Sequence, residues 1–449
     1  MGGFRIIRDA SIAVMSLCDL QNHNPAKQYR LSDYVYRCTI GTATLYYSCL
    51  TGELIEVTDL NDAFEYMVNH WFYVDKAYNE KENVPKLRRL MQALEMSEKP
   101  GYNQFEILTT TNCNADCIYC YEHGYKRITM NKEIANQVVH YIKKNLWGED
   151  ARIRWYGGEP LMNIQAIDCI SEGLSKNGIS FSSKMISNGY FFSKEIIEKA
   201  NKIWNLKNVR VTFDGLEQTH NKVKRYKNPS PSPFFRTIEN IELLLKANIS
   251  VTVRINVERH NVDEIPDLIG QMCKLFGKTE LLDYMIRPLN NTGTLTTIES
   301  DEKARKLIFN RVDEVKASLF ENGYNINSQK LRALASHSCY ADNKRYLLIK
   351  PNGSISFCPE DFDNKQFGTI SDDSICTRPK SYYEYNYDKG EICNDCPLYI
   401  NCYPNRQCPA FHESVCNEMK KNSIIRDLEL SIRKEYRQYM NKHIAYETA

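Results

Sequence analysis

Hydrophobic and polar residues alternate in short runs over the first hundred residues, and this pattern predicts a small α+β unit. The β-rich runs YVYRCTI and TLYYSCL are separated by a turn-prone Gly-Thr pair, and the run LTGELIEV follows. Asp59 precedes an amphipathic run and is a suitable N-terminal cap for a helix over 60–71. A second, charged helix is expected over 83–98. The Pro100-Gly101 pair then marks a domain boundary.

The pattern changes between residues 105 and 288, where short β runs alternate with helical periodicity. The β runs are FEILTT, IRWY, SSKMIS, VRVTF, SVTVRINV and LLDYMIRP. Helical stretches lie between them, at 132–146, 164–175, 194–203, 235–247 and 262–276. This alternation is typical of βαβ units and a parallel sheet. Six strands rather than eight favour a partial (β/α)6 barrel, whose active site lies at the carboxyl ends of the strands.

The last part of the chain has a different composition. The segment 335–416 is rich in Cys, Pro, Asn, Asp and Tyr and shows little periodicity, so we expect bound metal to stabilise it. The stretch 424–444 predicts a charged amphipathic helix. The pattern therefore divides the chain into the segments 1–100, 101–290, 291–334, 335–420 and 421–449.

Charge and cysteine content narrow the class of protein. Fifty-eight basic and 56 acidic residues leave a net charge of +2, which does not indicate binding to nucleic acid or to a membrane surface. The sequence has neither a signal-peptide core at its start nor an apolar run of about 18 residues. We therefore expect a cytoplasmic protein. Because the cytosol keeps thiols reduced, the 16 cysteines indicate metal binding better than disulfides.

The first cysteine group follows the run FEILTT, in the segment TTNCNADCIYCYE. Cys113, Cys117 and Cys120 form a C-x3-C-x2-C motif in one short loop. Three thiolates can hold three irons of a 4Fe–4S cubane and leave the fourth iron open to a small ligand. The alternative is a zinc site in which His123 supplies the fourth ligand.

With Tyr119 before its last cysteine, this motif resembles that of the radical S-adenosylmethionine superfamily. The resemblance covers about residues 103–290 and includes WYGGEP after the second strand, ISNG after the third and an arginine in the fifth. It implies that S-adenosylmethionine is bound by Tyr119, Gly157, Gly158, Glu159, Pro160, Ser187, Asn188 and Arg254. The alternatives are an ordinary turn at GGEP and a surface ion pair for Arg254.

A second cysteine group resembles the SPASM extension of that superfamily. The resemblance implies two auxiliary 4Fe–4S clusters, which brings the total to three. Cys339, Cys358 and Cys408 would hold the nearer cluster, and Cys393, Cys396, Cys402 and Cys416 the distal one. The chain departs from the family in the five residues between Cys402 and Cys408, where three are usual. Zinc sites of the ribbon type are the alternative.

The nearer auxiliary cluster has only three family-matched cysteines, because Ala333 stands where the family sometimes has another. A substrate thiolate could fill the open position. Alternatively His337, Cys376, Asp361 or water completes the cluster. Glu360 and Asp361 are also the candidates for a catalytic acid or base.

The resemblance implies an enzyme that forms a 5′-deoxyadenosyl radical and abstracts hydrogen from a ribosomally made precursor peptide. A cross-link would result, with a thioether as the first expectation and a carbon–carbon bond as the second. A winged-helix-like unit at the N-terminus would bind the leader by strand addition, unless it is a structural cap. Flavodoxin or ferredoxin would supply electrons. The alternatives are an anaerobic sulfatase-maturing enzyme, another enzyme-activating member of the superfamily, and a non-catalytic zinc-binding interaction module.

Overall fold

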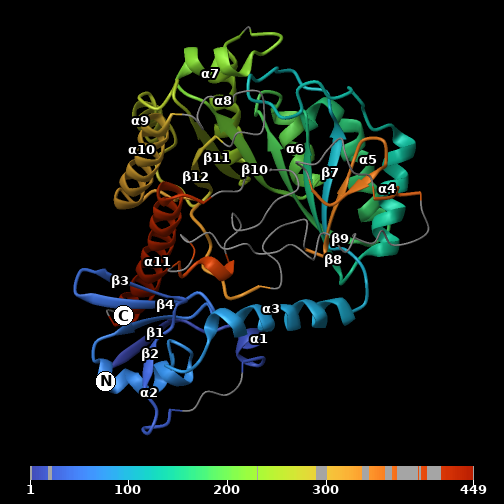
Figure 1. The fold of residues 1–449 in the computed structure, drawn as a ribbon. Coiled ribbons are helices and arrows are strands. Elements are labelled where there is room, and N and C mark those ends of the chain that lie inside the picture. Colours follow the sequence, from blue (N-terminus) through green and yellow to red (C-terminus); the bar gives the residue numbers. More distant parts are fainter. Residues whose placement is uncertain are drawn as a thin grey trace. The chain divides into compact units, whose positions relative to one another are not determined.

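The alternating strands and helices predicted between residues 105 and 288 form one sheet in the computed structural model. The structure describes residues 3–18, 23–229, 231–289, 301–335, 343–358, 367–371, 393, 396–401 and 416–447. The chain divides into two units (Figure 1). Unit 1 comprises Met1–Glu98, Ser328–Cys339 and Tyr385–Ala449, and unit 2 comprises Lys99–Asn327 and Tyr340–Glu384.

The sheet of unit 2 contains the six predicted strands, and all six are parallel to their neighbours. They are β7 (Gln104–Thr110), β8 (Asp150–Gly157), β9 (Ser180–Ser187), β10 (Leu206–Phe213), β11 (Ser250–Val257) and β12 (Leu282–Pro288). The order in the sheet is β12-β11-β10-β9-β8-β7-β13-β14. Each of the six therefore pairs with the strand that precedes or follows it in sequence. The α/β fold with a parallel sheet predicted for this region is confirmed.

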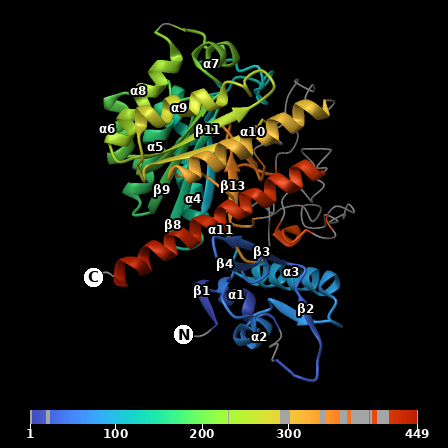
Figure 2. The same ribbon diagram turned by 90° about the vertical axis from the view of Figure 1, so that its left-hand side faces the viewer.

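Helices between these strands lie along one face of the sheet (Figures 1 and 2). They are α4 (Lys132–Asn145), α5 (Ile164–Lys176), α6 (Lys194–Lys202), α8 (Pro233–Lys246) and α9 (Ile265–Phe276). Polar caps begin two of them, since the side chains of Asn131 and Ser193 accept hydrogen bonds from backbone N–H groups of α4 and α6. The five helices match the five predicted stretches to within a few residues at each end.

Among the described residues of unit 2, two strands and two α-helices were not predicted. They are β13 (Tyr346–Ile349), β14 (Ile355–Ser356), α7 (Glu217–Lys224) and α10 (Glu302–Glu321). β13 extends the sheet parallel to β7, and its four residues are buried. It escaped prediction because four apolar residues show no period, and only pairing with β7 fixes them as a strand. α10 lies in the segment 291–334, which was expected to connect the barrel to the cysteine-rich part.

Unit 1 contains a four-stranded antiparallel sheet in the order β1-β5-β4-β3 and a separate β2-β6 pair. Its strands are β1 (Phe4–Arg8), β2 (Tyr29–Leu31), β3 (Val35–Ile40), β4 (Ala43–Ser48), β5 (Leu54–Val57) and β6 (Tyr73–Asp75). Its helices are α1 (Ile12–Met15), α2 (Leu60–Asn69), α3 (Glu80–Ser97) and α11 (Glu418–Glu447). The predicted strands β3, β4 and β5 are confirmed. So is the cap of α2, where Asp59 accepts a hydrogen bond from Asn61 N at 2.8 Å.

The core of unit 1 is assembled from distant parts of the chain. Leu45, Leu50 and Leu54 of the N-terminal part pack in one cluster with Leu331 and Leu334 and with the C-terminal residues Leu398, Ile400, Leu428 and Ile432. The predicted C-terminal helix is present as α11, and it is amphipathic rather than apolar. Among the described residues, no helix is both long and apolar enough to cross a membrane.

Candidate functional site

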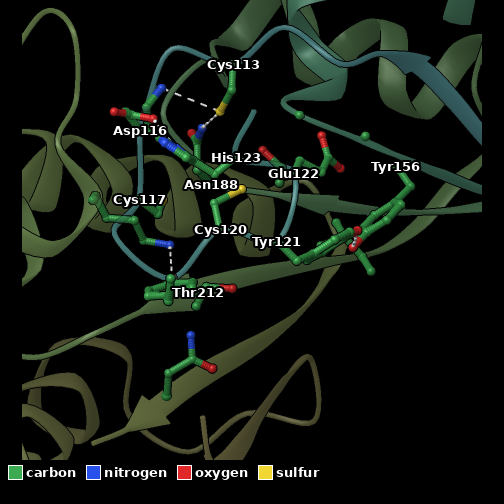
Figure 3. A pocket seen from close by; sticks show the side chains of 18 of the residues that line it. Cys113, Asp116, Cys117, Cys120, Tyr121, Glu122, His123, Tyr156, Asn188 and Thr212 are labelled. Carbon is green, nitrogen blue, oxygen red and sulfur yellow. Dashed lines mark hydrogen bonds and ion pairs between the residues drawn. The ribbon is translucent and has the colours of Figure 1, made fainter. Parts of the chain in front are cut away.

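A pocket of about 270 Å³ opens at the carboxyl ends of the strands of unit 2 (Figure 3). It is lined by the cysteine loop that follows β7 and by residues at the ends of β8, β9, β10 and β11. Among its lining residues are Cys113, Cys117, Tyr119, Cys120, Tyr156, Gly157, Gly158, Ser187, Asn188, Thr212, Lys224, Arg254 and Asn256. Ligand sites of α/β sheets commonly lie at this edge, because the loops that follow parallel strands converge there.

The three cysteines of the first motif lie around this pocket. The loop turns back on itself at its end, where Cys120 N donates to Cys117 O at 3.0 Å. Burial raises the pKa of the Cys113 thiol to about 12 and that of the Cys117 and Cys120 thiols to about 11. The thiols are therefore protonated at neutral pH in the protein alone, and a bound metal must displace their protons.

The backbone around the end of α7 holds the cysteine loop in place. Asp116 N donates to Lys224 O at 3.0 Å, and Ile118 N donates to Val223 O at 3.1 Å. Further along, Lys227 N donates to Asn114 O at 2.9 Å, and Lys227 Nζ donates to Cys113 O at 2.7 Å. The conformation of the loop is thus fixed by a segment more than 100 residues further along the chain.

A buried polar network lies against the same loop. Tyr119 Oη donates to Asp214 Oδ2 at 2.9 Å, and Lys224 Nζ lies 3.1 Å from Tyr119 Oη and 3.2 Å from Asp214 Oδ2. Burial would raise the pKa of Asp214, but the Lys224 ammonium lowers it below its usual value. Burial opposes the charge of Lys224 too, yet Asp214 raises the lysine pKa well above its usual value. Asp214 and Lys224 therefore remain an ion pair at neutral pH.

The network continues to Arg254, another cation that lines the pocket. Asn256 Nδ2 donates to Asp214 Oδ1 at 2.9 Å, and Arg254 Nε donates to Asn256 Oδ1 at 2.8 Å. Among the described residues, the Arg254 guanidinium makes this one side-chain hydrogen bond, through Nε. The two terminal nitrogens of the guanidinium therefore remain available to a ligand. Arg254 and Lys224 thus present two cations to one pocket, which suits a ligand that carries a carboxylate.

The glycines of WYGGEP make a close contact inside the protein. Gly158 N donates to Thr110 O at 3.0 Å. A Cβ atom on Gly157 or Gly158 would collide with the carbonyl oxygen of Thr110 or Asn112. These two glycines, which also line the pocket, therefore allow a close approach of two backbone segments. It places the turn against the residue that precedes Cys113.

Glu159 acts within the protein. Its buried carboxylate accepts hydrogen bonds from Ser187 Oγ at 2.9 Å, Asn188 N at 2.8 Å and Leu161 N at 3.2 Å. Burial raises its pKa to about 7, against the lowering effect of these donors. Neither Glu159 nor Pro160 lines the pocket, whereas Ser187 and Asn188 do. Glu159 thus joins the end of β8 to the end of β9 and orients Asn188, whose Nδ2 donates to Asn114 Oδ1 at 2.7 Å.

The donor set fits a cluster whose ligands bind different irons. Among the described residues, no three His, Cys, Asp or Glu side chains converge on a single metal ion. A zinc ion needs such convergence, whereas each thiolate of a cubane binds its own iron. His123, the fourth ligand of the zinc alternative, has an exposed side chain whose Nδ1 lies 3.4 Å from Asp116 Oδ1.

The structure brings together part of the second cysteine group. Cys396 N donates to Cys393 O at 3.2 Å in unit 1, and burial together with these two neighbours raises the pKa of the Cys416 thiol. Cys358 follows β14 in unit 2. The remaining predicted site residues lie outside the described part of the chain: Cys339, Glu360, Asp361, Cys402 and Cys408.

Asp214, Lys224 and Asn256 were not predicted from the sequence. Asp214 comes directly after the run VRVTF and Asn256 lies near the end of SVTVRINV, so their positions at strand ends carried a usable signal. Lys224 gives no such signal. It lies at the end of a short helix that was not predicted, and only the fold directs it into the pocket.

Comparison with known proteins supports a radical S-adenosylmethionine domain. Residues 107–272 match the family model of the Radical SAM superfamily. An uncharacterized protein of Methanocaldococcus jannaschii is 24% identical over 283 residues, which are 62% of this chain and 93% of that protein. The AdoMet-dependent heme synthase of Methanosarcina barkeri is 23% identical over 173 residues, which are 38% of this chain and 46% of that protein.

Two solved structures show a similar fold. Native anSMEcpe with bound AdoMet and Cp18Cys peptide has a TM-score of 0.56 and 16% identity, over 76% of this chain and 100% of that one. Streptococcus suis SuiB bound to the precursor peptide SuiA has a TM-score of 0.51 and 13% identity, over 84% of this chain and 94% of that one. At such identities the likeness establishes the fold and leaves the substrate open.

Proposed function

We propose that this protein is a radical S-adenosylmethionine enzyme that modifies a ribosomally made peptide. One observation carries the proposal. Residues from Cys113 to Arg254 in the sequence, at the ends of successive strands, line a single pocket of unit 2. They include three thiols, a glycine turn, a Ser-Asn pair and the cations Lys224 and Arg254. This is the set that an open-iron cluster and an amino-acid-bearing sulfonium ligand require.

Each part of the pocket has a distinct role. Cys113, Cys117 and Cys120 would hold three irons of a 4Fe–4S cluster, and Arg254 with Lys224 would face the carboxylate of S-adenosylmethionine. Asn188, held by Glu159, would orient the ligand from the end of β9. When bound, the cluster and S-adenosylmethionine supply a 5′-deoxyadenosyl radical that takes hydrogen from an unactivated C–H bond.

The peptide substrate is supported by unit 1. Its strand β3 is the last of the four-stranded sheet and pairs with β4 on one side, while no described strand pairs with its other side. An extended peptide can add to such an edge through main-chain hydrogen bonds. The similar folds of anSMEcpe and SuiB were solved with peptides bound, which makes a peptide the substrate class to test first.

Two auxiliary 4Fe–4S clusters and an electron donor such as flavodoxin or ferredoxin complete the proposal. The proximity of Cys393, Cys396 and Cys416 in unit 1 supports the distal cluster alone. A thioether is the first product to look for. The nearer auxiliary cluster, if one of its irons is open, would hold a substrate thiolate near the carbon radical.

Replacement of Cys113, Cys117 and Cys120 by Ala tests the proposal. We expect the triple variant to form no 5′-deoxyadenosine after reduction with dithionite, because no other described cysteines line the pocket. The matched control is the double variant Cys169→Ala/Cys273→Ala, which changes two cysteines of unit 2 that lie away from the pocket and should keep the activity.

Undiminished 5′-deoxyadenosine from the triple variant would exclude this assignment. Metal analysis separates the enzyme from the zinc-binding alternative, since protein purified without oxygen should be brown and rich in iron. A colourless, zinc-containing protein would contradict the proposal as a whole.

A further inference from the structure

Lys224 is a buried cation in the wall of the proposed cluster site. Its side chain is only 4% exposed, yet it lines the pocket together with Cys117 and Cys120. Its Nζ lies 5.7 Å from the centre of the Tyr119 ring and 3.1 Å from Tyr119 Oη. Tyr119 lies between Cys117 and Cys120 in sequence, so the lysine contacts the loop between two of its cysteines.

The partner of this cation is held away from the pocket. Asp214 does not line the pocket, and its carboxylate accepts hydrogen bonds from Asn256 and Tyr119. Both charges contact Tyr119 of the cysteine loop, but only the ammonium of the pair is among the groups that line the pocket. A group in the pocket is nearer the positive end of the pair and experiences a net favourable field for negative charge.

The backbone of the same residue also supports the loop. Lys224 O accepts a hydrogen bond from Asp116 N, and its neighbour Val223 O accepts one from Ile118 N. The loop is thus connected to Lys224 on both sides of Cys117, by main chain and through Tyr119. The contact with Tyr119 is the one that depends on the lysine side chain, so a change there would reach the thiols through this tyrosine.

We propose that Lys224 is a positioning residue of the three-cysteine loop, and that its ammonium raises the midpoint potential of the cluster held there. This inference rests on the proposed function. Reduction of a cluster by one electron adds a negative charge, which a nearby oriented cation stabilises. Lys224 would therefore make the cluster easier to reduce by a biological donor.

The test compares midpoint potentials measured by redox titration with EPR detection, without S-adenosylmethionine. Lys224→Arg keeps the cation, and Lys222→Met changes an exposed lysine of the same helix. Both should match the wild-type potential. Lys224→Met leaves Asp214 alone and should show the lowest potential. The double variant Asp214→Asn/Lys224→Met removes both charges, avoids a buried unpaired carboxylate, and should lie between these values.

A second measurement reports on positioning. We expect a chelator to remove iron from the three-cysteine cluster several-fold faster in Lys224→Met than in Lys222→Met, while the auxiliary clusters lose iron at unchanged rates. If the double variant binds iron and has the potential and the iron-loss rate of the Lys222→Met control, the inference is overturned.

The two proposals fail in different ways. Wild-type protein whose three cysteines bind no iron would contradict the proposed function itself. Wild-type protein that binds iron and cleaves S-adenosylmethionine, with a potential insensitive to Lys224, would contradict only the role given to this lysine.

Discussion

The two units of this protein differ in how far apart in sequence their contacts lie. In unit 2, each strand from β7 to β12 pairs with a neighbour in sequence, and the pocket forms where these strands end. In unit 1, the main core joins residues near Leu45, Leu334, Leu398 and Leu428, which no local pattern connects. Unit 2 is built from repeated local units, whereas unit 1 exists only when three distant segments meet.

This difference bears on the two groups of cysteines. Cys113, Cys117 and Cys120 lie within eight residues of one loop, so any fold that forms the loop brings them together. Cys393 and Cys396 instead belong to, or pack against, the core that unit 1 builds around its N-terminal sheet. The first metal site therefore depends on local structure, and the second depends on the assembly of unit 1.

Of the changes considered, deletion of residues 1–98 should have the largest effect, because it removes the N-terminal segment of the unit 1 core. The C-terminal part of unit 1 would lose the core residues that cover Leu398, Leu428 and Ile432, each of which is at most 2% exposed. Exposing one such side chain costs roughly 1.5–3 kcal/mol. We expect α11 to become sensitive to protease and the auxiliary iron to be lost.

Cleavage of S-adenosylmethionine should survive the same deletion, because the residues lining the pocket all lie between 113 and 289. Modification of a leader-bearing peptide should be weakened. Intact auxiliary iron and a protected α11 in the truncated chain would show that the N-terminal part folds separately. The comparison between the units would then be wrong.

The substitution Gly158→Ala should have the next largest effect, on the local site of unit 2. The new methyl group would collide with the backbone of Asn112, and backbone atoms cannot move aside as a flexible side chain can. Overpacking of this kind costs about 1–3 kcal/mol. Because Asn112 precedes Cys113, we expect selective loss of iron from the three-cysteine site.

Gly270→Ala in α9 is the matched control, since a Cβ atom there meets no heavy atom within 4 Å. Alanine also favours a helix by about 1 kcal/mol, so this variant should be as stable as wild type or more so. Iron content measured separately for the three-cysteine and auxiliary sites decides the outcome. Equal iron in the two variants would mean that the glycine contact does not position the loop.

The smallest expected effect is a change in stability at acid pH when His220 is replaced. This side chain is fully buried among Phe213, Phe234 and Tyr226, and neither ring nitrogen has a hydrogen-bond partner among the described residues. Burial lowers the pKa of His220 to about 3, from 6.5. Its neutral form therefore supports folding above pH 6.5, and this contribution is lost as the pH falls toward 3.

His220→Phe should abolish this part of the acid sensitivity. At pH 8 we expect its free energy of unfolding to stay within about 1.5 kcal/mol of the wild-type value. Between pH 8 and pH 5, the histidine should lower the free energy of unfolding of the wild-type protein by about 2 kcal/mol. The variant should not show this decrease. Denaturant unfolding at both pH values measures this, with the exposed His140→Gln as control. A pH dependence shared by all three proteins would contradict the role of His220.

Much of unit 2 was determined by the sequence alone. The runs that became β7 to β12 carry their own alternation, and the helices between them carry their own period and caps, so local preference and final structure agree. The three-cysteine motif was visible for the same reason, because its members lie in one loop. The expectations for Ser187, Asn188 and Arg254 came from the resemblance to the radical S-adenosylmethionine superfamily, and all three residues line the pocket at the strand ends.

Only the tertiary structure decided the rest. The contact of Gly158 with Asn112, the role of Glu159 in holding Asn188, and the contact of Lys224 with Tyr119 join residues 29 to more than 100 positions apart. The core of unit 1 and the pairing of β13 with β7 are of the same kind. Such contacts depend on which surfaces meet after the elements form, and periodicity describes each element but not its partner.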